Sequence, residues 1–219
     1  MQNSANNLAN LTTSGFKKSK VNSTENKSGG SSLNSISKIN TQGSLIPTNN
    51  PLDLAIKGNG FFQVTNPNGR ISFTRSGNFK LNSAGQVVDA NGNSLVPGIN
   101  IPIGNDGIVI GANGQVSVKT LDGLEVAGQI QLANFNNPAG LTAAGENLLN
   151  ESALSGAPIM GNPGDGSLGS VVSGFLEGSN VDISEEIIGQ IASKAAFNAN
   201  INIIKTNDKM IGSVLDIKS

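Results

Sequence analysis

The sequence predicts a mainly β protein with helical ends, in which short antiparallel hairpins are inserted between an N-terminal segment and a long C-terminal helix. Two observations carry this prediction. Short β-prone runs separated by Asn-Gly and Asp-Gly pairs fill residues 52–135, and a proline-free amphipathic pattern occupies residues 183–215. The order of these patterns suggests three parts, with boundaries at 1–50, 51–177 and 178–219.

The N-terminal part is polar. Leu8 and Leu11 fit the end of a helix that stops near Asn10, and Gly15 allows a turn after it. Residues 22–50 are rich in Ser, Asn, Thr and Gly and contain few large apolar side chains. Such a segment buries little apolar surface, so we expect it to be extended or partly disordered.

The β-prone runs share β-branched and aromatic residues and are bounded by turn residues. They are 54–56, 61–64, 71–74, 78–81, 86–89, 94–96, 99–103, 108–110, 115–119 and 126–135. Asn68-Gly69, Asn91-Gly92 and Asn113-Gly114 lie between them and supply the positive φ that tight hairpins need. Beyond this module we expect a short helical piece near 143–149 and a last strand over 168–177.

The C-terminal helix has a marked start. Asp182 with Glu185 three residues later can form a capping box, and Ser184 is a second cap candidate. Phe197, Ile201 and Ile204 begin an apolar row, while Ala residues form a second row. A helix of about 32 residues is roughly 48 Å long. Because an apolar surface of that length needs a helical partner, we favour assembly between subunits.

Composition excludes several functions. The chain has 219 residues, a net charge of −1, and neither Cys nor His. Disulfides, thiol nucleophiles, Ser-His-Asp catalysis and His- or Cys-based metal sites are therefore impossible, and no global field favours nucleic acid. The sequence contains no run of eighteen apolar residues, so it predicts no transmembrane helix. Residues 1–10 are polar and lack the pattern of a cleaved signal peptide.

Short motifs that could carry chemistry have simpler interpretations. Gly58-Asn59-Gly60 favours a turn between strands over a dinucleotide loop, and Asp89–Asn93 favours a hairpin over a calcium loop. Glu185-Glu186 complements the helix dipole. Arg70 and Arg75 are more typical of a solvated sheet face than of single-strand nucleic-acid binding. We expect no enzymatic activity and no cofactor or metal.

Three groups of motifs stand out along the chain. They are Asn6-Asn7-Leu8-Ala9-Asn10 with Thr13-Ser14-Gly15-Phe16-Lys17; Leu54-Ala55-Ile56-Lys57-Gly58-Asn59-Gly60-Phe61-Phe62 with Phe73-Thr74-Arg75-Ser76-Gly77-Asn78-Phe79; and Gly178-Ser179-Asn180-Val181-Asp182 with Asn198-Ala199-Asn200 and the run from Ile203 to Met210. Together, and in this order, they resemble the motifs of bacterial flagellar rod and hook proteins. In that family about thirty helical residues precede the first motif, whereas five do here, so we expect most of the first helix to be missing. Phe197 stands where rod proteins usually carry Tyr. The chain is too short for the hook protein's additional outer domain, which favours a rod-type architecture.

The resemblance implies a structural subunit that packs its terminal helices in the core of a hollow axial tube, with the β-domain outside. It implies as partners further copies of the chain, other axial proteins and the flagellar export apparatus, and export without a cleaved signal. The expected assembly interface is Leu8, Leu11, Ile187, Ile188, Ile191, Ala195, Phe197, Ile201, Ile204, Ile211 and Leu215. A secreted β-rich adhesin or glycan-binding module is the alternative.

Overall fold

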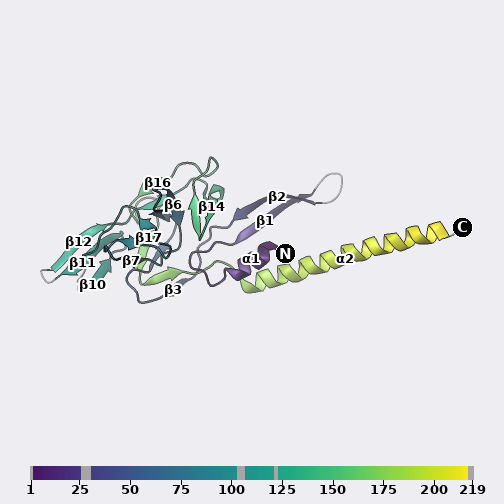
Figure 1. Cartoon of the computed structure of the whole chain (residues 1–219), viewed down its shortest axis with the longest axis horizontal. Coiled ribbons are helices and arrows are strands. Elements are labelled where there is room, and N and C mark those ends of the chain that lie inside the picture. Colours follow the sequence, from purple (N-terminus) through teal and green to yellow (C-terminus); the bar gives the residue numbers. More distant parts are fainter. Residues whose placement is uncertain (1, 26–30, 103–106, 121–122, 217–219) are drawn as a thin grey trace.

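A β-rich body carries a long C-terminal helix that extends away from it (Figure 1). The computed structural model describes residues 2–25, 31–102, 107–120 and 123–216. Within these ranges, only the backbone is described for residues 22–35 and 212–216. Helix α1 (Gln2–Ala9) lies beside the base of helix α2 (Ile183–Asp216), and the far end of α2 is the tip of the molecule (Figure 1). This arrangement confirms the predicted fold class.

The largest sheet holds most of the body together. Its strands are β5 (Phe61–Thr65), β6 (Ile71–Thr74), β7 (Lys80–Leu81), β8 (Val87–Val88), β9 (Ser94–Leu95), β13 (Leu132–Asn134), β14 (Thr142–Gly145), β15 (Leu148–Asn150) and β16 (Ile159–Gly161). They follow the order β14-β15-β6-β5-β9-β8-β7, and β13 joins β5 to β16. The predicted turn at Asn91-Gly92 connects β8 to β9, with Gly92 at φ 86° and Asp89 Oδ1 accepting the amides of Asn91 and Asn93.

Smaller antiparallel sheets surround this one. Strands β10 (Gly107–Ile110), β11 (Gln115–Thr120) and β12 (Gly123–Gln129) form a three-stranded sheet, and a 3₁₀ turn covers Pro138–Gly140. Strand β4 (Leu54–Lys57) pairs with β17 (Ser170–Ser173), and β3 (Leu45–Pro47) pairs with β18 (Phe175–Glu177). Because β18 leads directly into α2, the pairing with β3 fixes where the helix leaves the body.

The core lies on both sides of β5. Successive residues of a strand point to opposite faces of the sheet. Phe62 and Val64 therefore contribute to a larger apolar cluster on one face, whereas Phe61 contributes to a smaller cluster on the other. The larger cluster comprises Leu54, Ile56, Phe62, Val64, Phe79, Val87, Leu95, Ile99, Ile101, Val116, Val118, Ile130, Leu132 and Val171. The smaller comprises Phe61, Phe73, Ala133, Phe135, Leu141 and Leu149. The larger cluster draws on residues from 54 to 171 and the smaller on residues from 61 to 149, so the body extends beyond the predicted 52–135 module.

Gln63 is a polar residue at the centre of this body. Its side chain is fully buried, and neither its amide oxygen nor its amide nitrogen has a hydrogen-bond partner. We expect Gln63→Met to raise the free energy of unfolding by about 1–2 kcal/mol, because methionine fills a similar volume without two unpaired polar atoms. Urea denaturation measures the change, with the exposed Gln115→Met as the matched control. A loss of stability in Gln63→Met would mean that the amide is satisfied in solution.

Residues 22–50 are extended where they are paired, which is one of the two expectations: strand β1 (Ser19–Glu25) pairs with β2 (Ser31–Lys38), and residues 26–30 lie outside the described residues. Two other local predictions are wrong. The helical piece near 143–149 is instead the β14–β15 hairpin, with Glu146 and Asn147 at positive φ in its turn. The single strand over 168–177 is broken at Gly174, at φ 79°, into β17 and β18.

Two further predicted strands differ. The run 126–135 is divided between β12 and β13, because Gln129 ends one sheet and Leu132 begins pairing with Phe62 in another. In the run 99–103, residue 103 lies outside the described residues. The preceding residues bond to the backbone of Gly85 and Val87 but form only an isolated bridge, at Asn100.

Candidate assembly surface and its anchoring junction

Helix α2 begins at a side-chain cap. Asp182 Oδ1 accepts hydrogen bonds from the amides of Ser184, at 2.8 Å, and Glu185, at 3.1 Å, which is N-cap geometry. Ser184 is therefore the second residue of the helix and not a cap. The Glu185 carboxylate accepts a hydrogen bond from Lys18 Nζ at 2.7 Å, so it ties the first turn to the N-terminal segment.

Most of the predicted interface residues on α2 face solvent. The exposed fraction is 67% for Ile188, 63% for Ile191 and 60% for Ile204. Ile187, Ala195, Phe197 and Ile211 are exposed as well, Ile201 is half-buried, and Leu215 belongs to the helix but its side chain is outside the described set. A helix with this many uncovered large apolar side chains is not stabilised by its own body beyond the base.

These apolar residues lie on two sides of the helix. Phe197, Ile201, Ile204 and Ile211 recur at spacings of four, three and seven, which places them along one side. A second row contains Ile188, Ala192, Ala195, Ala199, Ile203 and Met210. Ile203 and Met210 are 66% and 65% exposed and are missing from the predicted interface. A helix that is apolar on two sides is suited to contact more than one neighbour.

Helix α1 contacts the base of α2 through a buried asparagine. Asn7 Nδ2 donates to Glu186 Oε1 at 2.9 Å and to the carbonyl of Ser19 at 2.9 Å, while Asn7 Oδ1 accepts from the amide of Ser19. One side chain thus joins α1, β1 and α2. The predicted interface residues Leu8 and Leu11 are half-buried here, and Leu11 lines a surface hollow with Ile46.

Below the helix base, three charged side chains form what we call the Glu177 cluster: Lys17, Arg75 and Glu177. Glu177 is fully buried, and its Oε1 accepts hydrogen bonds from Lys17 Nζ and from the amide of Gly43, the latter at 3.0 Å. Arg75 Nη1 lies 3.3 Å from Glu177 Oε2. Lys17 comes from the N-terminal segment, Arg75 directly follows β6 and Glu177 ends β18, so the cluster ties the N-terminal segment to the β-rich body close to the start of α2.

The two cations of the Glu177 cluster are also held by neutral groups. Lys17 Nζ donates to the carbonyl of Thr41 at 2.7 Å, and Arg75 Nη2 donates to the carbonyl of Gly58 at 2.9 Å. The Arg75 guanidinium lies 5.2 Å from the centre of the Phe61 ring, a cation–π distance. The interpretation of Arg75 as part of a solvated sheet face is therefore wrong, because the side chain is only 5% exposed, whereas Arg70 is exposed as expected.

Burial and charge act in opposite directions on these groups. Burial lowers the pKa of Lys17 below its ordinary value, while the hydrogen bond and the charge of Glu177 act to raise it. Burial likewise lowers the pKa of Arg75, again opposed by the charge of Glu177. The charge of the Glu177 carboxylate thus offsets the desolvation penalty of the two buried cations, Lys17 and Arg75.

Gly15 and Asn180 also connect the segments that meet at the base of α2, a region that we call the junction. Gly15, at φ 69°, donates its amide to the carbonyl of Glu177 at 2.7 Å, and a Cβ there would overlap the backbone of Arg75 and Ser76. Asn180 Oδ1 accepts the amide of Lys18 at 2.7 Å. Its Nδ2 donates to the carbonyls of Ile39 and Thr41. The N-terminal segment, the 39–43 segment and the entry to α2 are therefore bonded to one another.

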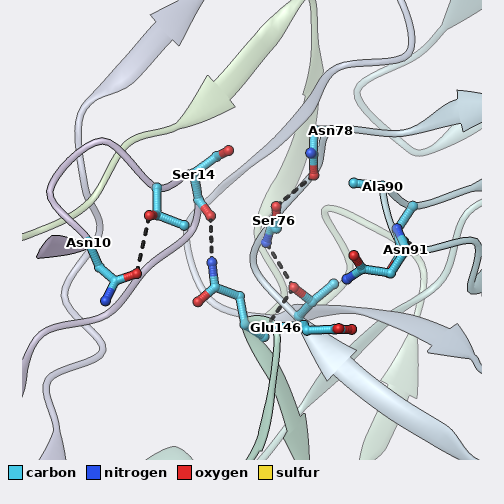
Figure 2. Close-up of a pocket in the computed structure, with 11 residues that line it drawn as sticks. Asn10, Ser14, Ser76, Asn78, Ala90, Asn91 and Glu146 are labelled. Atoms are coloured by element: carbon cyan, nitrogen blue, oxygen red, sulfur yellow. Dashed lines mark hydrogen bonds between the residues drawn. The ribbon is translucent and has the colours of Figure 1, made fainter. Parts of the chain in front are cut away.

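A polar pocket of ≈ 340 Å³ lies beside this junction (Figure 2). Its lining is Asn10, Thr13, Ser14, Thr74, Ser76, Asn78, Asp89, Ala90, Asn91, Glu146 and Asn147. Ser76 Oγ donates to Asn78 Oδ1 at 2.7 Å, and Asn147 Nδ2 donates to the carbonyl of Ser14 at 3.3 Å (Figure 2). The bond from Asn147 to Ser14 ties the β14–β15 turn to the N-terminal segment across this pocket.

The described residues contain no group of three or more carboxylates able to hold a metal ion. Within the same ranges, no helix is both long and apolar enough to cross a membrane.

A β-rich body that holds the base of a long helix, while both apolar sides of that helix face solvent, defines a structural subunit made for assembly. Residues 55–118 match the family model described as the flagellar hook protein FlgE/F/G D1 domain, and residues 172–217 match the flagellar basal body rod FlgEFG protein C-terminal model. The chain belongs to this family of flagellar rod and hook proteins, and it is a structural subunit of the flagellar axis.

Individual relatives agree with this assignment. The flagellar basal-body rod protein FlgG of Caulobacter vibrioides is 41% identical over 194 residues, covering 87% of this chain and 74% of the relative. FlgG of Bacillus subtilis is 34% identical, covering 97% of this chain and 91% of the relative. The flagellar hook protein FlgE of Salmonella typhimurium is 34% identical over 139 residues, which cover 62% of this chain and 32% of the hook protein.

The three groups of motifs that carry the resemblance converge on the junction. Asn7 and Lys17 come from the first group, Arg75 from the second and Asn180 from the third, and all four contribute hydrogen bonds there. The residue that sequence reasoning missed is Glu177, which immediately precedes the third motif. One pattern in the sequence could have indicated it. Glu177 is an acid at the end of a predicted strand, and Lys17 and Arg75 are cations inside the other two motif groups.

Proposed function

We propose that this chain is a rod-type subunit of the flagellar axis, which assembles into a hollow tube by burying α2 between neighbouring subunits and transmits torque through that tube. The observation that carries the proposal is the exposure of large apolar side chains along two sides of α2, including Ile191, Ile203 and Ile204. Apolar surface of this extent is covered in a working protein by a partner. The interface residues given above would provide that contact.

Coverage of the relatives favours the rod over the hook. Alignments to FlgG proteins cover between 74% and 91% of their length, whereas the alignment to the hook protein FlgE covers 32% of it. Most of the length of that hook protein therefore has no aligned counterpart in this chain. The proposed neighbours are therefore further copies of this chain and the adjoining axial proteins, and the proposed site of action is the axis between the basal body and the cell surface. Delivery by the flagellar export apparatus without a cleaved signal, and the absence of enzymatic activity, are parts of the same proposal.

The three-part division proposed is 1–50 as axial helix and linker, 51–177 as the outer β-domain and 178–219 as the axial helix. Support comes from the change of character at Glu177, where the last paired strand ends and the capped helix follows. The Glu177 cluster connects these parts. Lys17 belongs to the first part, Arg75 and Glu177 belong to the second, and Gly178, the next residue after Glu177, begins the third.

Amide hydrogen exchange tests whether α2 is completed by assembly. In the dilute chain we expect fast exchange over 190–215 and strong protection of β5, because most helix stability comes from packing and α2 has little beyond its base. In isolated basal bodies the same residues should become protected. Strong protection throughout 190–215 at low concentration would contradict the proposal, and protection of β5 in both samples serves as the internal control.

A further inference from the structure

A small cavity of ≈ 10 Å³ lies next to the Glu177 cluster. It is lined by Gly15, Lys17, Lys38, Arg75, Asn147 and Leu149. Three of these six residues are cations and none is an acid. The volume is about that needed for one water-sized occupant.

The strand register explains why Lys38 is present there. Ser19 of β1 pairs with Lys38 of β2, so the two side chains share one face of the ladder. Lys17 precedes Ser19 by two residues and, by the alternation of extended chain, points to the same side. The amide of Ile39 donates to the carbonyl of Lys18 at 2.9 Å, which continues the pairing to the cavity. The hairpin therefore brings a second lysine to a site that already contains Lys17 and Arg75.

The charges at this site do not balance. The only carboxylate in the cluster is Glu177, and its oxygens already accept Lys17 Nζ, the amide of Gly43 and Arg75 Nη1. Lys38 is half-buried, and burial lowers its pKa below the ordinary value with no carboxylate to oppose the shift. Three cations against one carboxylate leave an excess of two positive charges in a desolvated place.

A buried donor at the same site also lacks an acceptor. Arg75 is 5% exposed, and its Nε has no hydrogen-bond partner. A buried N–H without an acceptor is unfavourable. The charged groups of the three cations that line the cavity are hydrogen-bond donors with no acceptor atom, which suits an anion.

We propose that this cavity binds one small monovalent anion, of which chloride is the simplest, between Lys38, Lys17 and Arg75. The excess positive charge of the lining selects an anion over a neutral occupant. The small volume selects a single-atom ion over sulfate, phosphate or a carboxylate side chain. Because the lining residues come from the N-terminal loop, β2, the segment after β6 and the β14–β15 hairpin, the anion would stabilise the folded arrangement of these segments and not the separated segments.

Thermal unfolding of the full chain at constant ionic strength tests the proposal. Sodium chloride replaces sodium gluconate from 0 to about 200 mM, so that general screening does not change. We expect the Tm to rise by roughly 4 °C along a one-site saturation curve. Line broadening of the chloride-35 resonance by the wild-type chain gives a second readout that does not depend on stability.

Lys38→Met should abolish both effects, and the exposed Lys119→Met should leave both unchanged. In gluconate alone, Lys38→Met should melt at or above the wild-type temperature, since it removes an unpaired charge. In chloride it should melt below wild type. That reversal separates an anion site from a purely structural role of Lys38. Equal wild-type melting temperatures in chloride and gluconate, with no line broadening, would assign the cavity to water and overturn the proposal.

Discussion

Replacing Glu177 with alanine is expected to lower the free energy of unfolding by about 3–5 kcal/mol, because it leaves two buried cations, Lys17 and Arg75, without their carboxylate. It also removes the acceptor of the Gly43 amide. The loss should be visible in urea denaturation followed by circular dichroism. This one substitution removes the bonds from three separate segments, those of Lys17, Gly43 and Arg75.

The exposed pair next to it provides a matched control. Glu185→Ala also deletes the glutamate partner of a lysine, at 2.7 Å, but the Glu185 side chain is 68% exposed. Its effect should stay within about 0.5 kcal/mol. A double-mutant cycle gives the decisive comparison, since Lys17→Met should soften the Glu177→Ala loss by removing one stranded cation. Additive losses would mean that the cavity left by the side chain, and not the charges, causes the effect.

Ile201→Asp is expected to abolish assembly of the axis while leaving the body folded. A carboxylate placed in the proposed apolar contact has no partner there, and such a charge costs about 3 kcal/mol or more at each contact, which is at least a hundredfold in affinity. The body does not include residue 201, so its unfolding transition should not move. In cells we expect normal amounts of the subunit together with loss of motility, measured by swimming assays and by electron microscopy of basal bodies.

Asn198→Asp is the control for this experiment. It places the same charge three residues earlier, between the two apolar rows and on the side of the helix that carries Lys194, Lys205 and Lys209. It should therefore leave assembly largely intact. Normal swimming in the Ile201→Asp strain, or equal defects in both strains, would argue against an apolar contact along that row.

The parts that the sequence predicted well are those decided by local chemistry. The start of α2 follows from Asp182 two residues before Ser184, and the β8–β9 turn follows from Asn91-Gly92; neither depends on distant residues. The error at 143–149 has a local cause as well. Alanine and leucine favour helix there, but Leu149 pairs with Phe73 on β6, and that tertiary contact overrides the propensity.

The junction could not be predicted in the same way. Burial of Arg75 depends on Glu177, which is 102 residues away, and on the ring of Phe61 across the turn. A single sequence contains no record of which acid a given cation meets, so an arginine among strand residues is assigned by default to the solvated face. The exposure of α2 agrees with the absence of a second apolar run of matching length in the sequence, and its burial between subunits stays a prediction.

The position of Glu177 has a consequence for the order in which the molecule can be completed. Lys17 and its carboxylate are separated by 160 residues, so a chain that emerges N-terminus first exposes both cations long before the residue that neutralises them. Closing a loop of that length is slow and can only happen when all but the last forty or so residues are out. The foot of α2 is therefore fixed last. A nascent chain therefore stays unclosed at the base of α2 until its synthesis is nearly finished.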